Sequence, residues 1–211
     1  MHGLGCRLCP DRRDRKHLMR AVLPAGIVRP IRRTHRLWWR GNQGSTSQCV
    51  GFAWHGLLRA LPHLQRKPDA SSIYHEAQKQ DEWDGEDYDG TSVRAGAKVL
   101  QEAGKLASYI WAFDLETALD WMGSKGPTVW GVNWYQKMFT PDPMTGLVTM
   151  SGKLVGGHAV VCLGFDEKKE WLIFQNSWGT DYGLHGRFKM RYADAKRLIS
   201  EEAEVCAPTE Y

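Results

Sequence analysis

The sequence predicts an α+β protein, because segments with helical character dominate its first half and strand-like segments dominate its second half. The apolar run from Val50 to Leu61 follows a Gly-rich polar loop and is stopped by Pro62, so it is expected to form a helix. Two apolar segments, 155–165 and 171–179, are typical of strands. A chain of 211 residues has the size of one domain, or of two small lobes around a shared cleft.

The other expected elements alternate with loops along the chain. Helices are expected over 71–80, 93–103 and 115–123, with Ser71 or Ser72 capping the first, residues 89–92 the second and Asp114 the third. A buried strand is expected over 126–134, a long loop over 135–153, a half-exposed strand over 186–192 and a closing helix over 193–203. The acidic run 81–90 lacks the spacing of an EF-hand calcium loop, so a solvated loop is expected there.

Composition points to a soluble globular protein without a membrane partner. The 42% hydrophobic fraction and ten tryptophans suffice for a packed core, and no segment approaches the roughly 18 apolar residues of a membrane helix. Arg20 and Pro24 interrupt the short apolar stretch near the N-terminus, so a cleaved signal peptide is not expected.

Charge divides the chain into a basic N-terminal arm, residues 1–38, and a main domain, residues 39–211. Residues 1–40 hold eleven Lys or Arg against two Asp, so the rest of the chain carries a net charge of about −5. Three roles for the arm remain open: docking on the acidic body, contact with nucleic acid, or solubility. Cys6 and Cys9 have the spacing of half a zinc site, but no second ligand pair follows, so no metal is expected.

Three residues in the order Cys, His, Asn suggest nucleophilic catalysis. Cys49 is placed at the start of a helix, where the partial positive charge of the helix N-terminus favours the thiolate form. His158 follows two glycines at the beginning of a strand, and it is the candidate base. Asn176 ends the next strand, and it is the candidate residue that orients the imidazole. The alternatives are a buried structural cysteine and a core histidine.

These residues and their surroundings resemble those of the papain-like cysteine peptidases. Gln43 stands six positions before Cys49, as the oxyanion glutamine of that family does, and the run Asn176 to Gly179 reads Asn-Ser-Trp-Gly, the family's asparagine motif. The resemblance covers about residues 39–192 and implies a two-lobed fold with a cleft between a helical lobe and a sheet lobe. It further implies that Trp178 shields the His–Asn hydrogen bond, and that Gly90 and Gly157 lie beside bound substrate.

Several positions depart from the family pattern. Val50 replaces the tryptophan that usually follows the nucleophile, Thr46 replaces a disulfide cysteine of secreted relatives, and Gly157 stands where an acidic residue or asparagine often precedes the histidine. Five cysteines, an odd number, also disfavour a disulfide framework. We therefore expect a shortened relative of the bacterial or phage type, located in a reducing cytoplasm or associated with a virion.

The expected function is a cysteine-type endopeptidase that hydrolyses protein or peptide substrates through a covalent acyl-enzyme, without a cofactor. One alternative is an acyltransferase, similar to a transglutaminase, in which an amine attacks the acyl-enzyme. The other is a non-catalytic structural or binding protein, such as a virion component. The arm is also expected to be removed by the enzyme itself, because it is strongly basic and lies just upstream of the catalytic loop.

Overall fold

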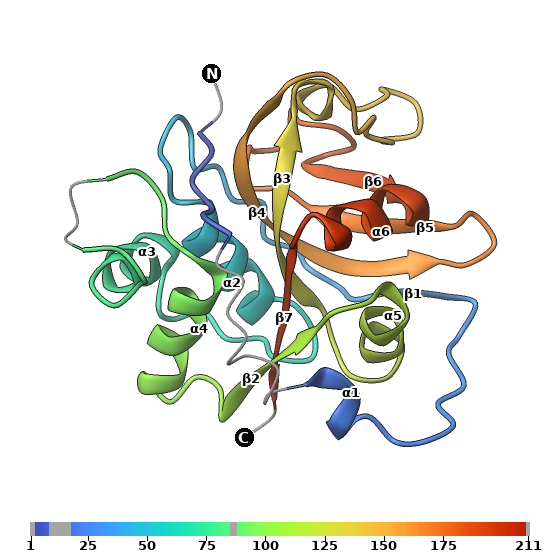
Figure 1. Ribbon diagram of the computed structural model, residues 1–211, viewed down its shortest axis with the longest axis horizontal. Coiled ribbons are helices and arrows are strands. Elements are labelled where there is room, and N and C mark those ends of the chain that lie inside the picture. Colours follow the sequence, from blue (N-terminus) through green and yellow to red (C-terminus); the bar gives the residue numbers. More distant parts are fainter. Residues whose placement is uncertain (1–2, 9–17, 85–87, 210–211) are drawn as a thin grey trace.

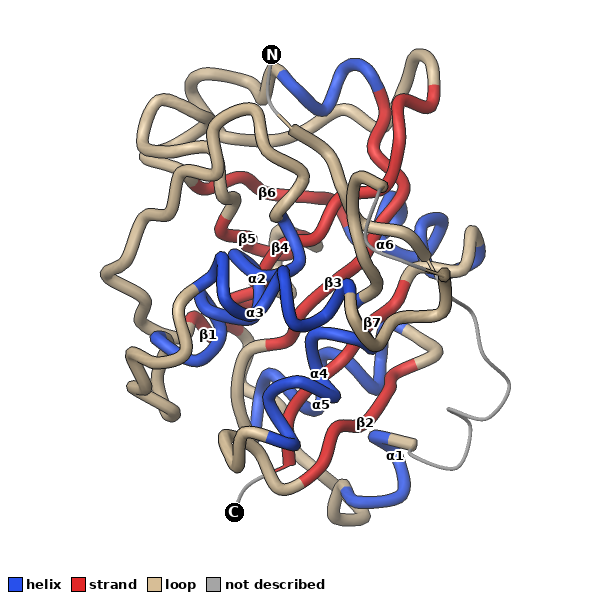
Figure 2. Tube along the Cα trace, turned by 90° about the vertical axis from the view of Figure 1, so that its left-hand side faces the viewer, coloured by secondary structure: helices blue, strands red, loops and turns tan. Residues whose placement is uncertain are grey.

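The structure is a computed structural model that describes residues 3–8, 18–84 and 88–209. A helical lobe lies beside a sheet lobe, as Figure 1 shows, and the predicted α+β class is confirmed. The helical lobe contains α2 (Cys49–Arg59), α3 (Ala70–Gln78) and α4 (Val93–Glu102). Figure 2 shows these helices in front of the sheet, with α2 against its central strands.

The sheet lobe is built on one antiparallel sheet. In the described residues, seven strands form this sheet in the order β2-β7-β3-β4-β5-β6, and β1 pairs with β4. Their bounds are Arg32–Thr34 (β1), Ser108–Ala112 (β2), Thr128–Tyr135 (β3), Leu154–Asp166 (β4), Trp171–Gln175 (β5), Arg187–Arg191 (β6) and Glu204–Thr209 (β7). The remaining helices of the described residues are α1 (Met19–Val22), α5 (Leu115–Ser124), the 3₁₀ helix η2 (Gln136–Phe139) and α6 (Tyr192–Ser200).

The predicted helices and strands are present, with shifted ends and some additions. Ser92 and Asp114 cap α4 and α5 as expected, but the cap of α3 is Asp69, whose carboxylate accepts the Ser72 N–H, so the expected Ser71 or Ser72 cap is wrong. The loop expected over 135–153 begins with η2. Strands β1, β2 and β7 were not predicted, because they are short and are defined mainly by their sheet partners.

Two large hydrophobic clusters form most of the described core, one between α2 and the sheet and one between the sheet and α5, and a small third cluster lies between α3 and α4. The Trp54 indole of α2 donates a hydrogen bond to the Val93 carbonyl of α4 at 2.9 Å. A methyl group added at Gly96 would lie 2.4 Å from the Trp54 ring, so glycine is what allows α4 to approach α2 this closely. The sheet on one side and α4 on the other therefore fix the position of α2, the helix that begins with Cys49.

The N-terminal arm is integrated into the body. Met19 is fully buried, β1 adds to the sheet beside β4, and Arg29 forms ion pairs with three carboxylates of Glu116, Asp120 and Glu167. Among the described residues, no helix has the length and apolarity that crossing a lipid bilayer requires.

Candidate active site

Cys49 is the first residue of α2 and is fully buried. Gln48 at the N-cap makes no side-chain capping bond, so the first N–H groups of the helix remain available to a ligand. Strand β4 packs against α2, and the backbone of Ala159 hydrogen-bonds the Cys49 thiol. The nucleophile candidate therefore lies against the residue that directly follows His158.

His158 and Asn176 come from adjacent regions of the sheet and are hydrogen-bonded. The distance from His158 Nε2 to Asn176 Oδ1 is 2.7 Å, and the Ser177 N–H donates to the same oxygen at 2.8 Å. Because this oxygen accepts a backbone N–H, it is the carbonyl oxygen of the amide, and His158 Nε2 must be the donor. In the neutral ring, the tautomer fixed by Asn176 makes Nδ1 the basic nitrogen.

Aromatic side chains hold the His158 ring in place. The Trp178 ring stacks on it with centroids 4.6 Å apart, and Trp134 of β3 meets its edge at 4.8 Å. Phe139 also stacks on Trp178, with ring centroids 5.3 Å apart. Burial of Trp178 at 2% exposure keeps water from the His158–Asn176 bond. The roles of Trp134 and Phe139 were missed, since an aromatic residue in a strand or loop is more often simple core packing.

Gln43 is held by hydrogen bonds to Ser177, the residue that follows Asn176. Its Oε1 accepts the Ser177 hydroxyl at 2.5 Å, and its backbone N–H donates to the Ser177 carbonyl at 2.8 Å. Gln43 Nε2 donates to the carbonyl oxygens of Thr46, at 2.6 Å, and Gly3, at 3.2 Å. The Ser177 contact links Gln43, the candidate oxyanion donor, to the loop that carries Asn176. The sequence did not reveal this link.

Residues 3–8 of the arm run between the two lobes, and Figure 1 shows this N-terminal segment passing α2 and α4 on one side and β3 and β4 on the other. Gly5 and Cys6 donate backbone N–H bonds to the Gly157 carbonyl at 3.2 and 3.1 Å. Arg7 donates to the Thr91 carbonyl at 3.0 Å, and Thr91 donates to the Gly5 carbonyl at 2.9 Å. This cleft segment, residues 3–8, is therefore bound as an extended peptide.

Gly90 and Gly157, the expected substrate neighbours, both touch this cleft segment. A methyl group added at Gly157 would lie 1.9 Å from the Cys6 carbonyl oxygen, and one at Gly90 would lie 2.4 Å from the Gly5 carbonyl oxygen. Gly90 also has a positive φ of 101°, which glycine adopts at no cost. The hydrogen bonds to the segment come from the neighbouring Thr91 rather than from Gly90.

Burial raises the pKa of the Cys49 thiol to about 12, and backbone hydrogen bonds at Ala159 and Gly5 offset part of this effect. With the cleft segment in place, the thiol is therefore neutral at physiological pH. Among the described residues, no disulfide joins Cys6, Cys49, Cys162 or Cys206. Cys9 of the considered zinc site lies outside the described residues, and in the described part of the chain no three metal-ligating side chains gather.

The family model of the papain family cysteine proteases matches residues 72–208. The chain belongs to the papain family of cysteine proteases. The matched range includes His158 and Asn176 and begins after Gln43 and Cys49.

Two curated relatives share shorter segments with this papain-family chain. A peptidase C1-like protein of Acanthamoeba polyphaga mimivirus is 39% identical over 70 residues, and a cathepsin B-like cysteine proteinase of Caenorhabditis elegans is 54% identical over 44 residues. These segments span 31% and 19% of this chain, and 22% and 12% of the two relatives.

Solved structures of the papain family share the fold. Xylellain, a cysteine protease from Xylella fastidiosa, superposes with a TM-score of 0.74 at 19% identity, over 100% of this chain and 97% of its own. Bromelain from Ananas comosus superposes with a TM-score of 0.62 at 14% identity, over 83% and 94% of the two chains. At these identities the likeness concerns the fold, and the predicted two-lobed architecture is confirmed.

Proposed function

We propose that this papain-family chain is a cysteine endopeptidase with Cys49 as nucleophile, His158 as base and Asn176 as the residue that orients the imidazole. The observation that carries the proposal is the cleft segment itself, since an extended peptide is hydrogen-bonded along the cleft with its Gly3 carbonyl at Gln43 Nε2. A cleft that binds a peptide backbone in this way suits a protein or peptide substrate.

Each group has a defined task in the proposed reaction. His158 Nδ1 takes the thiol proton, and the Cys49 thiolate attacks the scissile carbonyl carbon to form a C–S bond. Gln43 Nε2 and the Cys49 N–H stabilise the oxyanion, a contribution worth about 10²–10³ in rate for each donor. The imidazolium then gives its proton to the leaving amine, and water, deprotonated by His158, cleaves the thioester to release the carboxylate.

We also propose that the chain is latent while residues 3–8 occupy the cleft. The segment uses the Gly157 carbonyl and Gln43 Nε2, which a substrate would need, and its Gly5 backbone lies at the Cys49 thiol. Activity then requires displacement or removal of the arm. Of the earlier options for the arm, docking on its own body is the one that these contacts favour.

The test of the peptidase proposal compares the wild type with Cys49→Ala and His158→Ala, using a fluorogenic peptide library and alkylation of Cys49 by iodoacetamide. We expect hydrolysis by the wild type after prolonged incubation, loss of detectable hydrolysis in both variants, and slower alkylation without His158. Product release that requires an added amine would favour the acyltransferase. Full activity of the Cys49→Ala chain would contradict the proposal.

A further inference from the structure

A pocket outside the cleft opens near the end of β7. Its walls come from the arm helix α1, the loop after α2, the end of α5 and the last residues of β7. The lining residues include Val22, Pro62, His63, Trp121, Lys125 and Pro208. We call it the α1–α5 pocket, defined by these residues. Its lining is separate from the groups of the proposed reaction and from the cleft segment.

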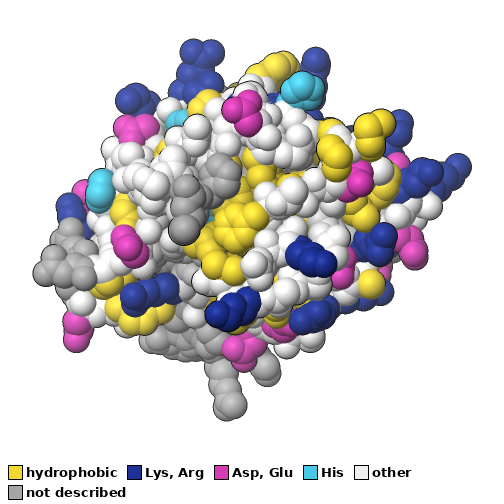
Figure 3. Space-filling model, turned by 90° about the horizontal axis from the view of Figure 1, so that it is seen from above, with side chains coloured by type: hydrophobic (Ala, Val, Ile, Leu, Met, Phe, Trp, Pro, Cys, Tyr) yellow, Lys and Arg dark blue, Asp and Glu magenta, His cyan; other side chains and the backbone are white. Residues whose placement is uncertain are grey.

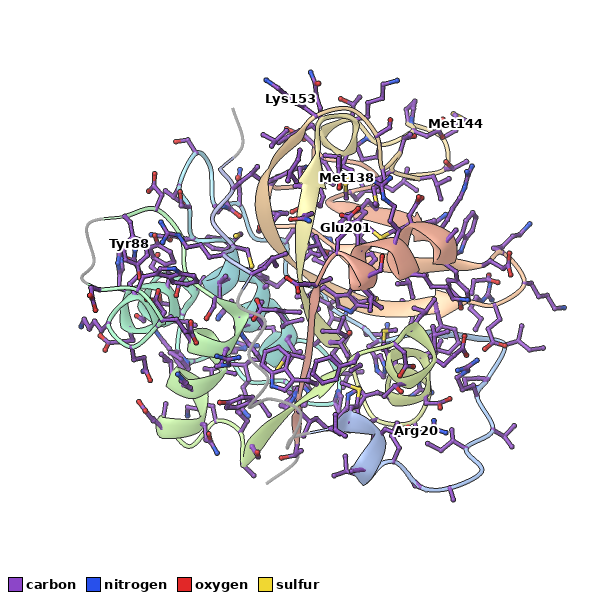
Figure 4. All side chains as sticks on the ribbon, viewed as in Figure 1. Arg20, Tyr88, Met138, Met144, Lys153 and Glu201 are labelled. Atoms are coloured by element: carbon purple, nitrogen blue, oxygen red, sulfur yellow. The ribbon has the colours of Figure 1, made fainter. Side chains whose placement is uncertain are left out.

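Packed elements form the walls of the α1–α5 pocket. Figure 1 shows α1 beside α5, and Arg20 of α1, labelled in Figure 4, donates to the Asp120 carboxylate of α5 at 2.8 Å. A methyl group added at Gly126, just after α5, would lie only 3.3 Å from Pro62 Cδ. The pocket has a volume of about 190 Å³. An apolar protein cavity of about 150 Å³ holds benzene, so the α1–α5 pocket has room for one aromatic ring.

Trp121 gives this pocket an unused hydrogen-bond donor. Its side chain is 5% exposed, and its Nε1 is buried without a hydrogen-bond partner among the described residues. Such an N–H has lost its hydrogen bonds to water and has gained no acceptor in exchange. A ligand that offers an acceptor to Nε1 would recover this loss.

Lys125 adds a positive charge where the pocket meets solvent. Its side chain is exposed, and no carboxylate in the described part of the chain forms an ion pair with it. The last turn of α5 carries a partial negative charge, which is smaller than the full positive charge of the ammonium group. Apolar walls, a buried N–H donor and a cation together suit a ligand with a ring and an anionic acceptor.

We propose that the α1–α5 pocket binds a small aromatic carboxylate. The ring would pack between Pro62 and Pro208, and the carboxylate would accept from Trp121 Nε1 and face the Lys125 ammonium group. Free aromatic acids and peptides that end in an aromatic residue both carry this chemical group. The inference does not depend on the proposed peptidase reaction.

The test measures the binding of three probes to the full chain by ligand-observed NMR titration: phenylacetate, phenylacetamide and acetate. Phenylacetamide lacks the charge of phenylacetate, and acetate lacks its ring. We expect a Kd on the order of 1 mM for phenylacetate, because it is a small ligand. Phenylacetamide should bind at least about fivefold more weakly, and acetate should show no measurable binding.

A tripeptide that ends in phenylalanine, with a free or an amidated C-terminus, separates the two sources of the ligand. It is measured on the Cys49→Ala chain, so that the peptide stays intact. Tighter binding of the free peptide than of phenylacetate would identify a peptide C-terminus as the ligand. Weaker binding would identify a free acid.

Two variants assign the binding to the α1–α5 pocket. Lys125→Gln should weaken phenylacetate by at least about fivefold and leave phenylacetamide unchanged. Trp121→Phe keeps a ring but removes the N–H, so it should weaken both probes. The matched controls are Lys169→Gln, at an exposed lysine after β4, and Trp111→Phe, at a buried indole that also lacks a partner for Nε1 but does not line the pocket. Both controls should bind as the wild type does.

Equal affinities for phenylacetate and phenylacetamide would overturn the inference, as would a phenylacetate affinity that Lys125→Gln leaves unchanged. Lys125 is exposed, so its variant decides the question even where Trp121→Phe destabilises the fold. The Gly5→Val chain, whose added side chain would collide with the Ser47 carbonyl and open the cleft, should bind phenylacetate with unchanged affinity. Tighter binding by the Gly5→Val chain would place the probe in the cleft and contradict the inference.

Discussion

Asn176 connects the two halves of the proposed catalytic apparatus at the scale of single residues. Its Oδ1 accepts from His158 Nε2, and the next residue, Ser177, donates its hydroxyl to Gln43 Oε1. The group that orients the base and the group that orients the oxyanion donor are therefore neighbours in the chain. A displacement of this loop would disturb proton transfer and oxyanion binding together.

Ser177→Ala tests this connection. Without the hydroxyl, Gln43 loses the bond that orients its Nε2, so we expect kcat to fall by about tenfold, less than the full loss of an oxyanion donor, with KM nearly unchanged. Steady-state kinetics in the Gly5→Val background measure both constants. Thr180→Ala is the control, since that exposed hydroxyl contacts only Asp181 among the described groups. An unchanged kcat in Ser177→Ala would show that Gln43 needs no such support.

The raised pKa of Cys49 predicts a pH dependence for the latent chain. Only the thiolate reacts, and a thiol with a pKa of about 12 is protonated below that pH. The alkylation rate of Cys49 should therefore rise by about tenfold per pH unit between pH 7 and pH 10. In the Gly5→Val chain we expect faster alkylation at pH 7 and a flatter profile. Mass spectrometry of the Cys49 peptide separates this cysteine from the others.

At the scale of elements, the cleft segment is held by close contacts that only glycine allows. A methyl group added at Gly5 would lie 2.1 Å from the Ser47 carbonyl oxygen, and one at Gly3 would lie 1.8 Å from the Thr46 carbonyl oxygen. Backbone atoms cannot give way as a flexible side chain can. A larger residue at either position should therefore expel the segment from the cleft.

Gly5→Val is accordingly expected to increase both peptide hydrolysis and Cys49 alkylation at pH 7 by at least about tenfold. Val28→Asp is the matched control, because Val28 belongs to the same arm and is 92% exposed. Equal rates for Gly5→Val and the wild type would rule out latency by this segment. An intact N-terminus, by mass spectrometry after prolonged incubation of active enzyme, would contradict self-removal of the arm.

At the scale of the whole molecule, ion pairs connect chain segments that are distant in sequence. The face seen in Figure 3 carries hydrophobic side chains near its centre, with basic and acidic side chains mixed around them. On the sheet lobe, Arg29 of the arm joins α5 to the turn after β4 through three carboxylates. This network anchors the arm independently of the cleft segment.

Arg29→Ala is expected to lower the free energy of unfolding by about 1 kcal/mol, a value reduced from that of buried pairs because the partners are partly exposed. For a chain of this size the melting temperature should fall by about 2–4 °C. Lys67→Ala removes a largely exposed cation 4.0 Å from Asp69 and should change little. Calorimetry in low and high salt measures both. A melting temperature unchanged by Arg29→Ala would show that the network adds no stability.

The sequence by itself determined the nucleophile helix, the two strands beside the candidate base and orienting residue, and the papain-like fold. These elements carry local signals: helical apolar spacing ended by proline, glycine-led apolar strands, and the Asn-Ser-Trp-Gly motif. The hydrogen bond between His158 and Asn176 follows from adjacent strands in the predicted sheet.

Only the tertiary structure decided how distant segments meet. The support of Gln43 by Ser177, the aromatic packing of Trp134 on His158, and the burial of residues 3–8 in the cleft all join parts of the chain separated by many residues. Strand β7 likewise becomes a strand through pairing with β2 and β3, and it places Glu204 opposite Gly131. Such contacts depend on the register and packing of the whole sheet, for which no local pattern of residues encodes a signal.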